Sequence, residues 1–350
     1  MLRRPTQEDV ARRAGVSKAT VGFSLTNRYD IGIPETTRQR VKQAAEEIGY
    51  RPNLAARALA SGRTNTITVA FPGTIDVYHS NVLQFFERIT NAHGYHLIAT
   101  TIGHIAPSNA LPDLWDLLNA PNDAIVLVDV FDRYRPYVDE LVPSSKPVVS
   151  MGIVDVTGVD SVHVDISVAA AAACNHLFLP NKDHVVFFGA NVSNTDHQTL
   201  IERSQQGQAD PRCVAYYRAA TERGIEPVII SGVDWTRAGT IAALKQYVAV
   251  HGCPDAIICT NDVLAIRVHG ELRRLGYRIP QDVRIVGCDG IEVSEDVAPS
   301  LSTIVQPVQE MCKLTWDLLQ ARLADPEIPR QYARLVAELR IRGSSDASLE

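Results

Sequence analysis

"TQEDVARRAGVSKATVGFSLTN", residues 6–27, places two short helical patterns on either side of the small stretch "AGVS". Thr6 is a favourable N-cap for the first helix, and Ser17 caps a second helix that we expect to end near Leu25. Gly15 permits a sharp turn between the two helices because it adopts a left-handed backbone without strain. The stretch therefore predicts two short helices joined by a tight turn, the arrangement of a helix-turn-helix.

A third helix and a short linker follow this pair. "PETTRQRVKQAAEEIG", residues 34–49, opens with Pro and ends with Gly, as helices commonly do. The three helices share a small predicted core of Val10, Ala14, Val21, Leu25, Val41, Ala45 and Ile48. "YRPNLAARALASGRTN", residues 50–65, contains one short helical pattern, from about Asn53 to Ser61. We expect it to be a linker with one helix in it.

The charge of the chain is divided unevenly. Residues 1–63 carry 12 Lys or Arg and 6 Asp or Glu, a net charge of +6, whereas the whole chain has a net charge of −6 at pH 7. A basic N-terminal segment on an acidic body is consistent with a head that approaches a polyanion, or with a merely solvated basic face.

From residue 66 the pattern changes to short apolar runs that alternate with amphipathic stretches. The runs include "TITVAF", "AIVLVDV", "HVVFFGA", "DAIICTN" and "VRIVGCD", and the amphipathic stretches include "NVLQFFERITNAHG" and "VLAIRVHGELRRLG". Such alternation is typical of parallel sheets with right-handed helical crossovers. The length of this part indicates two lobes. We expect an all-α head and an α/β body.

The composition argues against several other classes of protein. No apolar run is long enough to span a bilayer, and the N-terminus lacks the apolar core of a signal peptide, so we expect a cytoplasmic protein. The six cysteines form no C-x-x-C pair, and we interpret them as buried or idle thiols, with no metal site. The motifs of hydrolases, phosphate-binding loops, dinucleotide sites and zinc peptidases are also missing, so we expect no catalytic residues and no cofactor.

These segments resemble the lactose-repressor/galactose-repressor (LacI/GalR) family of bacterial transcription regulators. The resemblance rests on "DVARRAGVSKATV", "TRQRVKQAAEEIGYRPN" and "AARALASGRTNTI" in the head, and on "VHVDISVAA", "RRLGYRIPQDVRIVGCDG" and "PSLSTIVQPV" in the body. It implies a helix-turn-helix head at 1–50, a hinge helix and linker at 51–64, and a two-lobed, periplasmic-binding-protein-like core at 65–342. We expect the tail, residues 343–350, to be disordered.

The resemblance implies a set of DNA-contacting residues. Lys18 and Ala19, at the start of the second helix, match positions that touch bases in the major groove. Ser17, Thr20 and Asn27 suit phosphate contacts that fix the register without reading sequence, and Thr6 is included with them. In the hinge the resemblance makes Leu59 a wedge between central base pairs of the minor groove, supported by Asn53 and Arg57.

One position departs from the family pattern. The common family stretch "TVSR" is "TVGF" here, so Gly22 and Phe23 replace Ser and Arg. Phe cannot donate a hydrogen bond to guanine. Two interpretations of Phe23 stay open: it covers a thymine methyl group, or it folds back onto the small core of the head.

The body carries the expected effector residues. Ligands of open α/β folds lie beyond the carboxyl ends of the strands. The residues there that match family effector positions are Tyr78, Asp165, Arg212, Trp235, Asn261 and Asp289. Carboxylates, an amide and a guanidinium pair with hydroxyls, and an indole face covers C–H surface, so this set favours a sugar.

The sequence thus predicts a DNA-binding transcriptional regulator that acts as a homodimer on a near-palindromic operator, with a small effector, a sugar, bound between two lobes. The first alternative is a sugar-binding receptor without DNA function. The second is an activator or co-repressor-type regulator that responds to a non-sugar metabolite.

Overall fold

The computed structural model describes residues 5–25, 31–51, 62–73, 75–102, 119–129, 146–190, 209–231 and 236–349. The chain separates into two compact units, Met1–Asn65 and Thr66–Glu350. Five of the expected site residues lie outside the described ranges: Asn27, Asn53, Arg57, Leu59 and Trp235.

The first unit contains α1 (Gln7–Ala14), α2 (Lys18–Leu25) and α3 (Glu35–Glu47). Thr6 caps α1 as predicted, and Asp9 completes a reciprocal capping box with it. Gly15 ends α1 in the left-handed conformation, with φ +65°. The buried core contains Val10, Ala11, Ala14, Val21, Val41, Ala44 and Ala45, with Leu25 and Ile48 packed against it. The helix-turn-helix pattern is therefore confirmed.

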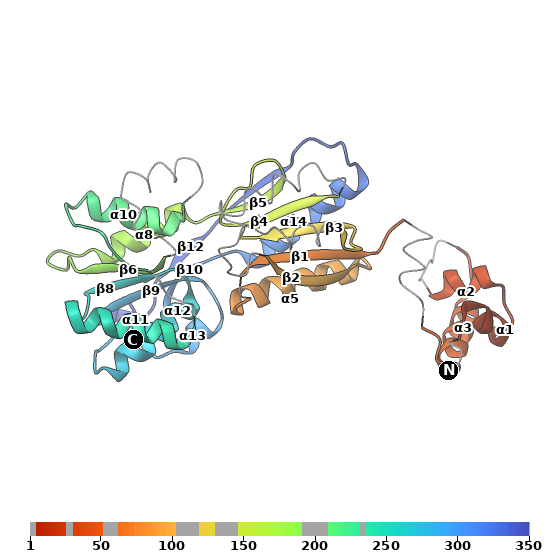
Figure 1. Ribbon diagram of the computed structural model, residues 1–350, viewed down its shortest axis with the longest axis horizontal. Helices are drawn as coiled ribbons and strands as arrows, with labels where there is room; N and C mark the ends of the chain where they lie inside the picture. Colours follow the sequence, from red (N-terminus) through yellow and green to blue (C-terminus); the bar gives the residue numbers. More distant parts are fainter. Residues whose placement is uncertain are drawn as a thin grey trace. The chain divides into compact units, whose positions relative to one another are not determined.

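The second unit contains two six-stranded sheets (Figure 1). Its strands are β1 (Thr66–Pro72), β2 (His96–Ile102), β3 (Ala124–Val128), β4 (Val148–Gly152), β5 (Asp160–Asp165), β6 (Val185–Ala190), β7 (Val228–Ser231), β8 (Ala256–Cys259), β9 (Arg284–Asp289), β10 (Ser302–Val305), β11 (Tyr332–Val336) and β12 (Glu338–Arg340). Its helices are α5 (Val77–Ala92), α8 (Ser167–Leu177), α10 (Pro211–Thr221), α11 (Arg237–His251), α12 (Asp262–Arg274), α13 (Val293–Asp296) and α14 (Val308–Ala324). A 3₁₀ turn, η2 (Ala347–Leu349), ends the described chain.

The first sheet has the order β11-β5-β4-β3-β1-β2 and is parallel throughout. With α5 and α14 it forms what we call the first lobe. The second sheet has the order β12-β10-β9-β8-β6-β7, in which only β12 runs antiparallel to its neighbour. With α8, α10, α11, α12 and α13 it forms the second lobe. The expected two-lobed α/β body is confirmed.

Residues along the strands of the second sheet alternate between two cores. Phe187 and Ile258 join the core that includes α8 and α10, whereas Phe188 and Ile257 pack with α11 and α12. Helices therefore cover both faces, with α8 and α10 on one and α11 and α12 on the other (Figure 1). Burial on both faces explains why these strands are continuous apolar runs in the sequence.

The chain passes between the lobes at three described places. It leaves the first lobe after β5, returns between β10 and α14, and crosses again between β11 and β12. Asp165, Gln306 and Ala337 lie at these crossings. The first and third are joined directly, because the Ala337 N–H donates to the Asp165 carbonyl over 3.1 Å.

The expectation of a disordered tail is wrong for residues 343–349. Ser344 and Ser345 are buried. The Ser344 hydroxyl donates to the Ile285 carbonyl over 2.7 Å, and the Ile285 N–H donates to the Ser344 carbonyl over 2.9 Å. The composition "GSSDAS" suggested disorder, but its small polar side chains supply hydrogen bonds to β9 and β10.

Candidate functional site

The first turn of α2 presents the side chains that the sequence assigned to base recognition. Lys18 and Ala19 are both exposed. Ser17 caps the helix, since its hydroxyl accepts from the Thr20 N–H over 3.1 Å and lies 2.9 Å from the Thr20 hydroxyl. Thr6 serves α1 instead: its hydroxyl donates to Asp9 over 2.7 Å. The DNA contacts of these residues stay a prediction.

Gly22 lies beside a contact between α1 and α2. A Cβ atom at this position would lie 2.9 Å from Nε2 of Gln7, whose amide donates to the Lys18 carbonyl over 3.3 Å. A larger residue at position 22 would therefore displace the flexible end of the Gln7 side chain. Phe23 is half-buried, and it is not among the hydrophobic side chains that pack on the described core of the head.

Arg38 fixes the exit of α2. Its side chain is 1% exposed, and its guanidinium donates to the carbonyls of Phe23, Ile31 and Ile33. A buried cation at the carboxyl end of a helix donates hydrogen bonds to carbonyls that have no partner within the helix, and it interacts favourably with the negative end of the helix dipole. The orientation of the exposed face of α2 thus depends on α3.

In the body, the amino ends of three helices carry polar caps. Asp76 caps α5 by accepting from the His79 N–H over 3.1 Å, and Asp210 caps α10 by accepting from the Arg212 N–H over 2.9 Å. Asn261 caps α12 by accepting from Leu264 over 2.8 Å. The Asn261 amide also donates across the two lobes to Asp76, over 3.5 Å.

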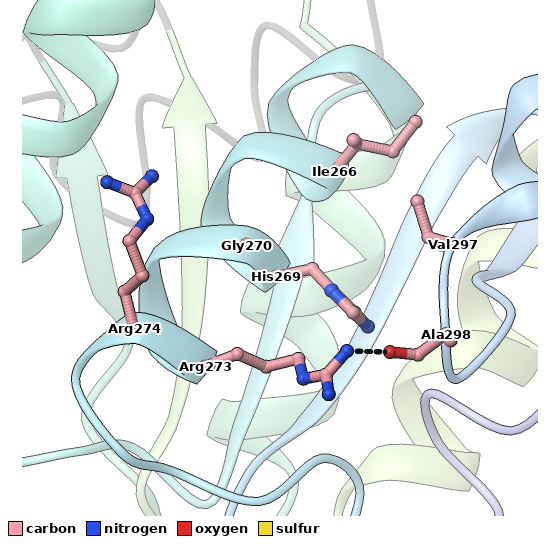
Figure 2. Close-up of a pocket in the computed structure, with 7 residues that line it drawn as sticks. All are labelled: Ile266, His269, Gly270, Arg273, Arg274, Val297 and Ala298. Carbon is pink, nitrogen blue, oxygen red and sulfur yellow. Dashed lines mark hydrogen bonds between the residues drawn. The ribbon is translucent and has the colours of Figure 1, made fainter.

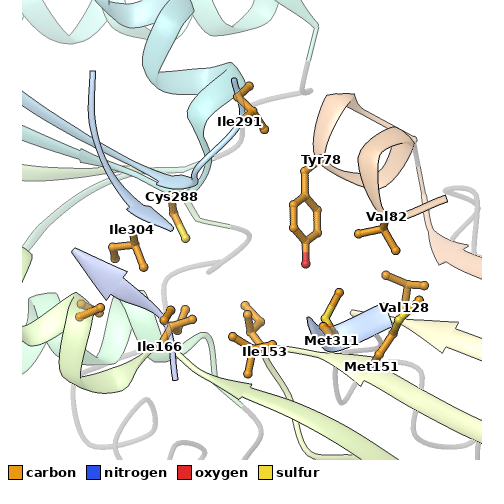
Figure 3. Close-up of a cluster of buried hydrophobic side chains, with 14 of the residues drawn as sticks. Tyr78, Val82, Val128, Met151, Ile153, Ile166, Cys288, Ile291, Ile304 and Met311 are labelled. Atoms are coloured by element: carbon orange, nitrogen blue, oxygen red, sulfur yellow. The ribbon is translucent and has the colours of Figure 1, made fainter. Parts of the chain in front are cut away.

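Tyr78 links the lobes through a chain of buried hydrogen bonds. It extends from α5 between the side chains of Val82 and Met311 and those of Cys288 and Ile291 (Figure 3). Its hydroxyl donates to Oε1 of Gln306 over 3.1 Å, and Nε2 of Gln306 donates to Oδ1 of Asp289 over 3.1 Å. Burial, together with the charges of Asp129 and Asp289, holds the pKa of Tyr78 well above its usual range.

Arg212 and Asp210 form a buried ion pair at the start of α10. Nη2 of Arg212 lies 2.8 Å from Asp210, and Nη1 donates to the Thr260 carbonyl at the end of β8. Burial alone would lower the pKa of Arg212, but the charge of Asp210, its hydrogen bond with Arg212 and the charge of Asp289 together hold that pKa well above its usual range. Arg212 is thus a fixed cation whose charge acts on Asp289.

His79 and Asp76 form a second ion pair, with 2.8 Å between Nδ1 and Oδ1. Burial opposes the charged imidazole, but the hydrogen bond and the charge of Asp76 raise the pKa of His79 overall. Asp129 follows β3 and is 8% exposed. Its Oδ1 accepts from the Ile153 N–H over 3.1 Å, and burial raises the pKa of its carboxyl.

We call Asp76, Asp129, Asp210, Asp262 and Asp289 the carboxyl cluster. Asp289 is 6% exposed, and burial followed by the charge of Asp262 holds its pKa well above the usual range. Asp262 accepts from the N–H groups of Gly290 and Ile291 and from the Thr303 hydroxyl. Burial still raises the pKa of Asp262 to about 6.

Asp165 differs from the other expected effector residues. Its carboxylate accepts from the Ser167 N–H over 2.9 Å and forms an ion pair with Arg334. No described hydrogen bond or ion pair joins it to the carboxyl cluster. The structure therefore brings Tyr78, Arg212, Asn261 and Asp289 together and places Asp165 at the crossing between the lobes.

Sequence reasoning missed several members of the site. Asp76, Asp129, Asp262 and Gln306 each follow or precede a strand end, but nothing in the local pattern distinguishes them from caps or turn residues. The signal that finds them is spatial: charge interactions join Asp289 to Asp76, Asp129 and Asp262, which are far apart in the sequence.

Two further observations bear on the class of protein. No described helix is long and apolar enough to cross a membrane. Within the described ranges, no three His, Cys, Asp or Glu side chains are arranged to hold a metal ion, and all six cysteines are free, with only Cys253 incompletely buried.

Two protein-family models match this chain. Residues 6–53 match "Bacterial regulatory proteins, lacI family", and residues 183–345 match "Periplasmic binding protein-like domain". Both matches fall on the elements described above, the first on the helical head and the second mainly on the second lobe.

The chain is also similar over nearly its whole length to characterised regulators. The transcriptional repressor CytR of Escherichia coli strain K12 is 27% identical over 346 residues, which cover 98% of this chain and 96% of CytR. Catabolite control protein A of Priestia megaterium is 28% identical over 342 residues, covering 96% and 98% of the two chains.

Solved structures share the fold. The lac repressor dimer bound to operator and the anti-inducer ONPF has a TM-score of 0.76 at 20% identity, with 98% of this chain and 99% of that chain covered. A complex of the transcriptional regulator CelR with cellobiose has a TM-score of 0.63 at 21% identity, with 97% and 100% covered. With its lacI-family helix-turn-helix domain at residues 6–53, its periplasmic-binding-protein-like body and its similarity over nearly the whole length to LacI-family repressors, this chain is a DNA-binding transcriptional regulator.

Proposed function

We propose that this protein is a repressor that binds a near-palindromic operator as a homodimer and changes its operator affinity when a small molecule occupies the cleft between its lobes. The observation that carries the proposal is the polar site built from both lobes, in which Tyr78, Gln306 and Asp289 form one hydrogen-bonded chain. A ligand that replaces these contacts changes the balance between lobe arrangements.

In this proposal residues 1–50 read the operator. Lys18 and Ala19 contact base edges, and Ser17, Thr20, Asn27 and Thr6 contact phosphates. The exposure of Lys18 and Ala19 on the first turn of α2 supports the assignment, since that end of a recognition helix enters the major groove.

Residues 51–64 act as the hinge. Asn53, Arg57 and Leu59 bind the minor groove at the operator centre, where Leu59 unstacks a base step. Two hinges meet there because a twofold dimer places its halves symmetrically on the DNA. This assignment rests on the family resemblance, since these residues lie outside the described ranges.

Residues 65–342 bind the effector and the partner subunit. We assign effector contacts to Tyr78, Arg212, Trp235, Asn261 and Asp289, and the donors and acceptors of this set suit a sugar. For Asp165 we propose a role at the crossing between the lobes, where it orders the start of α8. The related proteins are transcriptional regulators, and we propose that ligand binds without chemical turnover.

A face of the second lobe suits the partner subunit. Beside α12 lies a cavity of about 460 Å³, lined by Ile266, His269, Gly270, Arg273, Arg274, Val297 and Ala298 (Figure 2). Nε2 of His269 is buried there and accepts or donates no hydrogen bond within the described part of the chain. The lining joins the apolar side chains of Ile266 and Val297 to the basic Arg273 and Arg274, a mixture that suits a protein–protein interface. We propose α12, together with α5, as the dimer surface.

The coupling between cleft and operator is a free energy, typically about 1–3 kcal/mol, and it is reciprocal. Because the head binds DNA, the protein is expected to act in the cytoplasm.

The test of the proposed function uses the full chain. Selection of bound sequences from a random pool yields the operator, and fluorescence anisotropy then measures operator affinity with and without candidate ligands found by thermal shift.

A saturating ligand is readily detected in such a screen. At 100 times its dissociation constant it adds about 2.7 kcal/mol to the stability of the folded state. We expect a ligand that both stabilises the protein and changes operator affinity at least fivefold. A protein that selects no sequence from the pool, or whose operator affinity is the same with every stabilising ligand, contradicts the proposal. Sedimentation of Ile266→Asp, compared with the unaltered chain, tests the dimer surface.

A further inference from the structure

The carboxyl cluster is unusual in how its charges are paired. Two of its members have a cation partner: Asp210 with Arg212, and Asp76 with His79, each at 2.8 Å. Asp262 has no cation partner among the described residues, but two backbone N–H groups and a hydroxyl surround it. This leaves Asp129 in the first lobe and Asp289 in the second.

Asp129 and Asp289 are each satisfied on one oxygen only. Oδ1 of Asp129 accepts from Ile153, and Oδ1 of Asp289 accepts from Gln306, both over 3.1 Å. Neither Oδ2 atom accepts a hydrogen bond from any residue that the structure describes. Both side chains are more than nine-tenths buried, at 8% and 6% exposed. A buried carboxyl with an unused acceptor carries a large desolvation penalty.

The helix termini do not remove this imbalance. The amino ends of α5, α10 and α12 contribute roughly half a positive charge each. The cations that act on the cluster are His79, Arg212 and Arg342, so the positive charge is still smaller than that of five ionised carboxylates. The deficit falls on the two carboxyls without an ion pair, Asp129 and Asp289, whose pKa values burial raises.

From this arrangement we infer that the effector carries a protonated amine, held between Asp129 of the first lobe and Asp289 of the second. An ammonium group has three N–H donors and no acceptor, so it supplies each carboxylate with a donor and a charge partner. The inference rests on the proposed function, because it names the ligand class of the same cleft. An amino sugar meets both the ammonium requirement and the expected hydroxyl contacts.

The carboxyls of both lobes act on one shared group, which supports a ligand that spans them. The charges of Asp129 and Asp289 both act on the Tyr78 hydroxyl, and the charges of Arg212, Asp262 and Asp76 act on Asp289. Arg212 acts on both carboxyls and His79 acts on Asp129, but neither carboxyl has an ion-pair partner among the described residues. A neutral hydroxyl bound here adds no positive charge, whereas an ammonium group places one between the two lobes and attracts both carboxyls.

The test compares matched ligands on the full chain. Thermal shift and calorimetry are run with glucosamine, galactosamine, mannosamine and putrescine. Each is paired with its hydroxyl counterpart, and the three amino sugars are also paired with their N-acetylated forms. We expect at least one amine to bind tenfold or more tightly than its neutral counterparts. The inference is wrong if no amine binds, if a neutral counterpart binds as tightly, or if Mg²⁺ or Ca²⁺ stabilises the protein as much.

Variants establish that the carboxyls are responsible. Asp129→Asn and Asp289→Asn keep the size and one acceptor oxygen but remove the charge. Each should weaken binding of the amine at least tenfold more than it weakens binding of the neutral counterpart. Asp317→Asn, an exposed carboxyl of α14, is the control and should bind both as the unaltered chain does. Equal losses for amine and neutral ligands in the cluster variants indicate a structural defect and overturn the inference.

Operator binding, measured in parallel, distinguishes failure of the ammonium inference from failure of the proposed function. A neutral sugar that binds the cleft and changes operator affinity retains the proposed function and removes the ammonium inference. A chain that prefers the amine but selects no DNA sequence retains the ammonium inference and removes the proposed function.

Discussion

Asp129 holds its position because the neighbouring strand has no side chain opposite it. Gly152 has φ +139°, and a Cβ there would lie 2.2 Å from Oδ1 of Asp129. Gly287 has the same relation to Asp262, where a Cβ would lie 2.2 Å from Oδ1. Both distances are far below van der Waals contact, so these glycines are requirements of the carboxyl cluster.

Gly152→Ala tests this dependence. The new methyl group forces the Asp129 carboxylate away from Ile153, and the backbone conformation is itself unfavourable for Ala. We expect at least a tenfold loss of effector affinity in calorimetry. Gly224→Ala is the matched control, since Gly224 also has a positive φ, +70°, but has nothing within 4 Å of the Cβ position. Similar effector affinities for the two variants contradict the argument.

Phe23 is the residue for which DNA readout and packing are still in competition. The side chain is half-buried, and both interpretations stay open. We expect Phe23→Arg to shift the selected half-site toward G·C at the facing base pair, by about 1–3 kcal/mol for a bidentate contact. Selection from a random pool, run on both proteins, measures this. Identical half-sites mean that Phe23 reads no base.

At the scale of elements, the sequence predicted helices, turns and strands best where the residues of the element itself form a recognisable pattern. The caps at Thr6 and Ser17, the Gly15 turn and the buried strands β1, β3, β6, β8 and β9 were all visible as local patterns. The strands β10 and β12 were not, and β12 has only three residues. Their pairing is set by contacts between distant segments.

The start of α5 shows the same limit. The amphipathic pattern predicted a helix from about Asn81, but α5 begins at Val77. The cap is a reciprocal pair between Asp76 and His79, which differs from the usual Ser or Thr with Glu. This turn brings Tyr78 and His79 into the cleft. The predicted start of the helix, near Asn81, therefore left out two residues of the proposed site. Gln306 gave no signal at all, since its partners are Tyr78 and Asp289.

The hinge helix belongs to this scale as well. Leu59→Ala should weaken operator binding far more than binding to random DNA, because a wedge acts only on a site that bends. Competition titrations on the selected operator and on random duplex, at one fixed salt concentration, measure both losses. Ala55→Gly, in the same predicted helix, is a control for lost helix propensity. Equal losses of affinity on the two DNAs exclude the wedge.

For the whole molecule, the buried carboxyls predict how stability depends on pH. Asp129 and Asp289 have raised pKa values in the folded state, so the folded chain keeps protons that the unfolded chain releases above about pH 4. Their contribution is present at low pH and is lost as pH rises through the folded values. The raised pKa of His79 adds a loss above its ordinary value of 6.5.

Other carboxyls oppose this trend at lower pH. Asp76 and Asp160 have lowered pKa values, and hydrogen bonds from Ser167 and Arg334 outweigh burial to lower the pKa of Asp165 to about 2. Their contributions are complete above about pH 4. We therefore expect the melting temperature to be highest in mild acid and to fall between pH 6 and 8, a range taken from these directions. Asp289→Asn should flatten the fall, and an equally steep fall in that variant contradicts the assignment.

The three passages of the chain between the lobes have a consequence for recombination between relatives. The second lobe is not one continuous piece of sequence, because α14 and β11, between Val308 and Val336, belong to the first lobe. A gene fusion with a single junction after β5 would therefore set the α14 of one parent against the first sheet of the other. Exchange of ligand response between two such regulators needs junctions at all three crossings, near residues 165, 306 and 337. In this architecture new specificities arise more readily from substitutions in the cleft than from shuffling of whole lobes.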